Sequence, residues 1–210
     1  MKKYKLVTQD LKTRKGEDNE TQWVIGEFHP TLDGDGDLCS LHWYHYYHDP
    51  LLAAFMNPGH ADIDNPKCFV IDALGNHKDD SGVKGGCTKM RLVREVEFPV
   101  ITREQRIAFA ILCAKEVYKD DKWNVWADEW LSEKNRSSSA AAAYAANAAT
   151  SYAAAYAASA AAYAAYASAY AAYAASAATY AASAATYAAS AASWTYKKLL
   201  SIAKKALKYN

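Results

Sequence analysis

The sequence predicts an α+β N-terminal domain followed by one long Ala-rich α-helix, an Ala-seam coiled coil, which ends in a basic amphipathic segment. Up to residue 100, runs of Val, Ile, Phe and Tyr are bounded by Gly, Pro, Asp and Asn, a pattern typical of short strands. From Ala140 to Ser193 the chain has no Gly, Pro or charged residue, and Ala has the highest helix propensity. The expected parts are a small α+β domain (1–100), a helical segment packing on it (101–136), the long helix (137–196) and the basic tail (197–210).

Four strands and one short helix are expected in the α+β domain. The apolar run between Pro50 and Pro58 is read as a short helix, because prolines bound it on both sides. Residues 31–39 are rich in Gly and Asp and predict a turn. The expected strands are residues 4–8, 21–28, 67–75 and 89–98.

The helical segment is expected to begin at Thr102. Thr102 and Gln105 have the spacing of a capping box, in which each side chain bonds the backbone N–H of the other residue. Apolar residues then recur at helical period and should face the core: Ile107, Ile111, Ala114 and Val117 or Tyr118. A second stripe, Trp123, Trp126 and Trp130, is interpreted as core packing, because large aromatic side chains dominate buried apolar area.

Two columns of the Ala-rich tract alternate by four and three residues and contain nothing except Ala. This is the spacing of the a and d positions of a coiled coil, and a strict period of seven favours a left-handed supercoil. A single helix over residues 140–193 would be roughly 80 Å long. The predicted self-association seam is Ala153, Ala157, Ala160, Ala164, Ala167, Ala171, Ala174, Ala178, Ala181, Ala185, Ala188 and Ala192.

Aromatic and hydroxyl side chains lie opposite this seam, at about 100° per residue. Because the tract has no charge to keep it soluble, self-association is expected. Two alternatives are a solitary helix stabilised by propensity alone and a compositional accident of a slipping DNA repeat. The predicted aromatic face is Tyr152, Tyr166, Tyr173, Tyr180, Tyr187 and Trp194.

The tail carries five lysines and an apolar stripe, whereas residues 1–139 have a net charge of −4. Three interpretations are open: cations that suit the helix C-terminus, docking on the acidic body of another copy, and binding to an anionic membrane surface. A mildly acidic body does not indicate a nucleic-acid-binding domain, so no nucleic acid is expected. The lysines are Lys197, Lys198, Lys204, Lys205 and Lys208.

Residues 39–48 include four residues of types that bind zinc. Zinc sites need three or four converging N or S ligands, and a strand would place alternate residues on opposite faces. Asp33, Asp35 and Asp37 begin like a calcium loop, but the positions that require Gly and Glu hold Leu38 and Tyr44. No cofactor, phosphate-binding loop or catalytic triad is indicated by spacing. The metal candidates are Cys39, His42, His45 and His48.

Targeting signals are not expected. The N-terminus has lysines but no apolar segment of a secretory signal, so the four cysteines are expected to be reduced. The Ala-rich tract is long enough to cross a membrane, but Ala is nearly neutral for insertion and Ser, Thr and Tyr interrupt it.

Residues 1–139 resemble a family of uncharacterised bacteriophage and prophage proteins. The resemblance rests on "WVIGE", "DLCSLHWYHYYHDPLLAAFMNPGHADI", "KGGCTKMRLVREVEFPVIT", "QRIAFAILCAKEVY" and "WNVWADEWLSEKNRS". It implies a phage origin, a small N-terminal α+β domain and an Ala-rich tail, with synthesis in the host cytoplasm and then virion association or release on lysis. It implies no known activity. Relatives interrupt the Ala tail with Arg, Glu or Trp, whereas this chain uses Ser, Thr and Tyr.

These observations favour a structural, self-assembling phage protein and not an enzyme. Its Ala seam would drive a homo-oligomeric bundle or filament, and the N-terminal domain would be displayed outside. One alternative is an ice-binding protein that uses the Ala/Thr helix face. Another is an enzyme or anti-defence factor in the N-terminal domain, with the tail as its oligomerising element.

Overall fold

The computed structural model describes residues 2–14, 16–17, 19–80, 82–137, 156, 159 and 171–209, with residues 171–179 as backbone. The chain divides into two compact units. The sheet unit comprises Met1–Asn57, Ala61–Val100 and Thr195–Leu200. The helical unit comprises Pro58–His60, Ile101–Trp194 and Ser201–Asn210.

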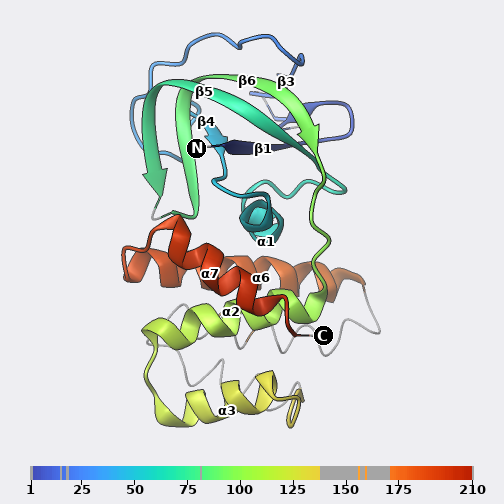
Figure 1. The fold of residues 1–210 in the computed structure, drawn as a ribbon, viewed down its shortest axis with the longest axis vertical. Helices are drawn as coiled ribbons and strands as arrows, with labels where there is room; N and C mark the ends of the chain where they lie inside the picture. The colour runs from blue at the N-terminus through green and yellow to red at the C-terminus, as the bar shows by residue number, and fades with distance from the viewer. Residues whose placement is uncertain are drawn as a thin grey trace. The chain divides into compact units, whose positions relative to one another are not determined.

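An antiparallel sheet of four strands forms the centre of the sheet unit, in the order β1-β5-β6-β4. Figure 1 shows β5 and β6 as two long, curved neighbours. The β5–β6 register shifts between Val70 and Ile71 and between Leu74 and His77, and such bulges bend a strand pair. The strands are β1 (Lys3–Val7), β4 (Tyr44–Tyr46), β5 (Lys67–Asp80) and β6 (Lys84–Val96).

Two smaller elements complete the sheet unit. A second antiparallel pair is formed by β2 (Lys12–Thr13) and β3 (Thr21–Gln22). The predicted short helix is confirmed as α1 (Pro50–His60), but its expected end before Pro58 is wrong, because Pro58 lies inside the helix. Its first turn is capped by Asp49, whose carboxylate accepts from the Leu51 N–H.

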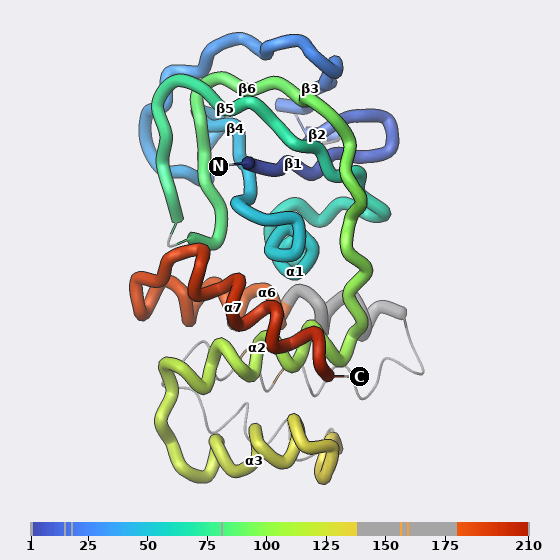
Figure 2. Tube along the Cα trace, in the orientation of Figure 1, coloured from blue at the N-terminus to red at the C-terminus, as the bar shows by residue number. Residues whose placement is uncertain are grey.

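The strand expected over residues 21–28 is wrong beyond its first two residues. Gly26 has a φ of +88°, outside the range of a strand. The chain after it follows β6 through irregular hydrogen bonds, from Gly26 N–H to Leu92 O and from His29 N–H to Met90 O (Figure 2). A step of three residues against two on β6 cannot form a regular ladder. β4 occupies the rest of this edge of β6.

Four helices are described in the later part of the chain: α2 (Arg103–Val117), α3 (Asp121–Leu131), α6 (Ala171–Ala191) and α7 (Tyr196–Ala206). The predicted capping box is confirmed, because Thr102 and Gln105 bond reciprocally at the start of α2. The predicted core residues Ile107, Ile111 and Ala114 are buried, as are Trp123, Trp126 and Trp130. Within the helical unit, α2 packs on both α3 and α6.

The prediction of one long coiled-coil helix is wrong. In the described residues the Ala-rich helix is α6, 21 residues long, and α7 follows it as a separate helix. The chain turns between them at Ser193, whose φ is +50°. Ala propensity favours a helix but does not decide where it ends, and here α6 ends within a packed unit. Among the described helices, none has both the length and the apolarity that a membrane crossing requires.

Candidate functional site: a buried lysine inside the curled sheet

The curled sheet encloses an apolar core that includes one lysine. Lys5 lies on β1 two residues before Val7, so their side chains share the inward face of the strand. Lys5 is 7% exposed, and among the described residues it is the one charged side chain that is buried. The core around the inward face consists of Val7, Trp23, Tyr46, Phe69, Ile71, Cys87, Met90 and Leu92.

The ammonium group of Lys5 has few partners. Its Nζ donates to the backbone oxygen of His45 at 3.0 Å and lies 4.9 Å from the ring centre of Trp23. A lysine ammonium has three N–H donors. Within the described part of the chain, no carboxylate pairs with Lys5 and no second acceptor bonds it. Buried charges are normally paired, so this group is an exception.

Burial favours the neutral forms of Lys5 and of three nearby ionisable groups, His45, His29 and Cys87. It lowers the pKa of Lys5 to about 7, and it lowers the pKa of His45 to about 3, with the charge of Lys5 as a second cause. Burial also lowers the pKa of His29 and raises the pKa of the Cys87 thiol to about 11. These surroundings therefore disfavour a positive charge on Lys5, and a nearby anion would favour that charge.

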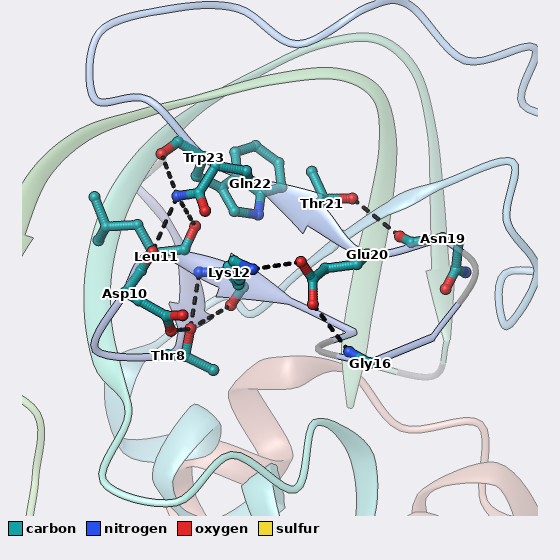
Figure 3. A network of polar contacts seen from close by, with 10 residues as sticks. All are labelled: Thr8, Asp10, Leu11, Lys12, Gly16, Asn19, Glu20, Thr21, Gln22 and Trp23. Carbon is teal, nitrogen blue, oxygen red and sulfur yellow. Dashed lines mark hydrogen bonds and ion pairs between the residues drawn. The ribbon is translucent and has the colours of Figure 1, made fainter.

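The β2–β3 pair holds Trp23 in place (Figure 3). The Lys5 ammonium lies over the Trp23 ring. The Trp23 N–H donates to Leu11 O at 2.8 Å, and its indole Nε1 donates to Thr13 Oγ1 at 3.0 Å. Lys12 of β2 forms an ion pair of 2.5 Å with Glu20, the residue just before β3. Hydrogen bonds from the backbone N–H and from the indole N–H thus both hold Trp23 in place.

A second lysine, Lys3, lies at the edge of the same inward face. Its Nζ is 3.1 Å from Nδ1 of His77 and 4.3 Å from the ring centre of Tyr46. Because Nδ1 accepts this bond, we assign the ring proton of neutral His77 to Nε2. Burial lowers the pKa of Lys3 and of His77 and raises the pKa of Tyr46 to about 12. Lys3 is half-buried and His77 exposed, so this end of the cluster borders solvent.

The arrangement has two chemical capacities. Lys5 can neutralise and hydrogen-bond an anion, and Lys3 lies two residues away on the same face of β1. An amine with a pKa near 7 also has a large neutral fraction at neutral pH, and the neutral form is a nucleophile.

The predicted metal candidates do not converge. In the part of the chain that the structure describes, no three His, Cys, Asp or Glu side chains gather around a possible metal position. Each candidate has a different partner: His42 Nδ1 lies 2.6 Å from Asp33 Oδ1, His45 Nε2 bonds Leu38 O, His48 Nε2 lies 2.7 Å from Asp79 Oδ2, and Cys39 Sγ lies 3.1 Å from Lys84 Nζ.

The predicted Ala seam is described in part. Ala181, Ala185 and Ala188 are at most 2% exposed inside the chain's own helical unit, and Ala192 is exposed. Ala171, Ala174 and Ala178 lie in α6, where the structure describes their backbone. The remaining members lie outside the described residues: Ala153, Ala157, Ala160, Ala164 and Ala167.

The predicted aromatic face also contacts its own chain. Tyr156 stacks on Tyr187 with ring centres 5.2 Å apart and lies 5.5 Å from Tyr180. Tyr187 is 42% exposed, and Tyr180 and Trp194 are half-buried. Tyr173 belongs to the backbone of α6, and Tyr152 and Tyr166 lie outside the described residues.

In the basic tail most lysines are exposed to solvent, whereas the main residues of its apolar stripe are buried. Leu199, Ile202, Ala203 and Ala206 are buried within the chain. Insertion of this stripe into a membrane would therefore first require its release. Of the predicted contact lysines, Lys197, Lys204, Lys205 and Lys208 are exposed and Lys198 is half-buried.

Sequence reasoning missed Lys5. The signal available was its position in "KYKLV", where Lys3, Lys5 and Val7 alternate and must share a face. Nothing in the alternation says that this face is the inward one, because the flanking Leu6 is buried as well.

No family model, curated protein or solved structure matches this chain.

Proposed function

We propose that the sheet unit is a binding module for a small anionic ligand, which it holds at Lys5 with Lys3 beside it. The observation that supports this is the buried Lys5 ammonium, bonded to one backbone oxygen and contacted by no carboxylate among the described residues. A bound carboxylate or phosphate would supply the missing counter-charge and would accept the remaining N–H bonds. It would also raise the pKa of Lys5, so that binding takes up a proton near pH 7.

The self-assembly and ice-binding hypotheses have less support. Both need an accessible helix face, and the Ala face of α6 is buried between Ala181 and Ala189. The hydroxyl of Thr186 donates to Ala182 O at 3.0 Å and bonds His60 Nε2 at 3.2 Å, so it is not a free ice-binding group. A bundle or filament stays a prediction for a surface other than this one, as does the phage origin.

The test is a calorimetric titration of the full chain with inorganic phosphate, acetate and pyruvate. Lys5→Met removes the ammonium and keeps a side chain of similar shape. Lys2→Met is the matched control, because Lys2 is exposed and lies just before β1. We expect saturable binding of at least one anion to the wild type and to Lys2→Met, and loss of this binding in Lys5→Met.

The same titration at two pH values adds an independent check. Affinity should be greater at pH 6 than at pH 9, because the ammonium is the form that binds. Equal affinity for Lys5→Met and the wild type, or no saturable binding of any of the three anions, would contradict the proposal.

A further inference from the structure

We infer that Lys5 is a carbonyl-binding lysine, whose amine forms a reversible imine with an anionic aldehyde or keto acid. This inference rests on the proposed function and deepens it, because it names the class of ligand. The geometry supports it: the Nζ of Lys5 has one backbone acceptor, the face of Trp23 on one side and no carboxylate among the described residues to keep it charged.

The surroundings of Lys5 favour condensation with loss of water. Phe69 is its partner in the β1–β5 register, and Val7 and Ile71 lie in the same apolar core. An apolar interior excludes water, and the neutral amine is the form that such an interior favours. Burial lowers the pKa of Lys5 to about 7, in agreement with this environment.

The reaction balances without an oxidant or reductant. The lone pair of the neutral amine forms a C–N bond to the carbonyl carbon, and a proton moves from nitrogen to the former carbonyl oxygen. The C–O bond then breaks, the nitrogen loses its second proton, and one water molecule leaves. The products are an imine and water, and hydrolysis reverses both steps.

Two neighbours suit the product. When the imine is protonated its positive charge lies near the Trp23 ring, which attracts cations through its π face. Lys3 is two residues away on the same face of β1, a spacing of about 7 Å along a strand. Its ammonium can pair with the carboxylate or phosphate of the ligand, which explains the expected preference for anionic carbonyl compounds.

The test is reductive trapping of the full chain with pyruvate and sodium cyanoborohydride at pH 7, followed by peptide mapping. We expect at least roughly ten times as much label on Lys5 as on exposed Lys2. The reason is that the neutral fraction of an amine at pH 7 rises steeply as its pKa falls. The preference should disappear when the wild-type chain is labelled in urea, because it depends on the folded environment. Label spread evenly over the lysines of the folded chain would overturn the inference.

A second variant separates this inference from the proposed function. Lys5→Arg keeps a cation but cannot form an imine, so it should lose the label while it retains phosphate binding. A wild type that binds phosphate but takes no label at Lys5 contradicts the imine and leaves the anion site standing. A wild type that neither binds an anion nor takes label contradicts both.

Discussion

The sheet unit and the helical unit fill their interiors differently. The three polar side chains that are buried in the described chain, Lys5, Asn57 and Thr88, all belong to the sheet unit. The described residues that are buried in the helical unit are Ala, Ile, Phe, Trp and Cys. The helical unit therefore has an interior explained by apolar packing, whereas the sheet unit holds polar groups whose presence needs a reason.

Two of the three polar groups have a structural reason. Asn57 donates to Ile63 O at 2.9 Å and accepts from its N–H at 3.2 Å, so it closes the end of α1. Thr88 accepts from the Asn76 N–H at 3.0 Å beside a β-bulge. Lys5 has one backbone hydrogen bond and no carboxylate partner among the described residues. A buried ionisable group whose hydrogen bonds do not account for its burial is therefore the better candidate for function.

The largest expected effect lies in the helical unit. Trp123 is 1% exposed and its ring lies 5.5 Å from that of Trp126, so Trp123→Ala removes a large buried surface and leaves a cavity. We expect the free energy of unfolding to fall by about 3–5 kcal/mol. Urea denaturation followed by circular dichroism measures this loss. A loss below about 1 kcal/mol would show that the aromatic stripe is not core.

In the sheet unit, by contrast, a substitution is expected to increase the free energy of unfolding. Lys5→Met should raise the free energy of unfolding by about 2–4 kcal/mol at pH 6. This is less than the roughly 5 kcal/mol that the pKa difference gives at about 1.4 kcal/mol per unit, because Met also loses the bond to His45 O. The folded pKa is near 7 and the ordinary value is 10.5, so the unfolded wild-type chain binds more protons between these values. Wild-type stability therefore rises with pH across this window.

The gain from Lys5→Met should accordingly be full below pH 7 and vanish by about pH 10–11. Urea denaturation at a series of pH values, with Lys2→Met as the control, checks this dependence. A Lys5→Met variant that is less stable than the wild type at every pH would mean that the lysine is needed for the fold.

A smaller effect tests the packing of α6. Ala185 and Ala192 belong to the same column of the predicted seam, but Ala185 is fully buried and Ala192 is exposed. Ala185→Leu should cost about 1–3 kcal/mol through overpacking inside the helical unit. Ala192→Leu should change stability by less than about 0.5 kcal/mol. If both variants instead increased association in sedimentation, the seam would face another copy.

The last comparison concerns the start of α7, which belongs to the sheet unit. Gly82 and Gly36 have similar φ values of +73° and +67°. A Cβ at Gly82 would overlap the backbone of Thr195 and Tyr196, whereas a Cβ at Gly36 would meet nothing. Both Ala variants carry a left-handed backbone penalty of about 1–2 kcal/mol, so a further loss in Gly82→Ala reports the docked segment.

Tyr196 offers a local readout for the same comparison. Its ring stacks on His48 with centres 4.8 Å apart, so release of this segment should change the His48 signals in NMR spectra. Equal stability loss and equal spectra in the two Gly variants would contradict the docking.

Local patterns predicted the local structure well. The capping box of Thr102 and Gln105, the helix that begins at Pro50 and the buried Trp stripe follow from spacing, because the residues that determine them are neighbours in sequence. The long helix failed for the opposite reason. Ala propensity is uniform along residues 140–193, whereas the end of α6 depends on a turn at Ser193 within a unit that includes α2, some 80 residues earlier.

The candidate site was not predicted, because its members become neighbours only through the fold. Trp23 reaches Lys5 through the β2–β3 pair, and the oxygen of His45 reaches it from β4. The histidine and cysteine cluster drew attention because its members are close in sequence. Only His45 lies on β4, and the other three lie on irregular segments before and after it, so each meets a separate partner.

If Lys5 binds an anion through its buried amine, the ionisation of that amine should respond to the anion. An NMR titration of the chain with ¹³C-labelled lysine reports the ionisation of Lys5, with Lys5→Met to assign its signal. We predict a midpoint near pH 7 in the free protein and an upward shift when a bound anion is present. A midpoint near 10.5 in the free protein, unchanged by the anion, would contradict anion binding at Lys5.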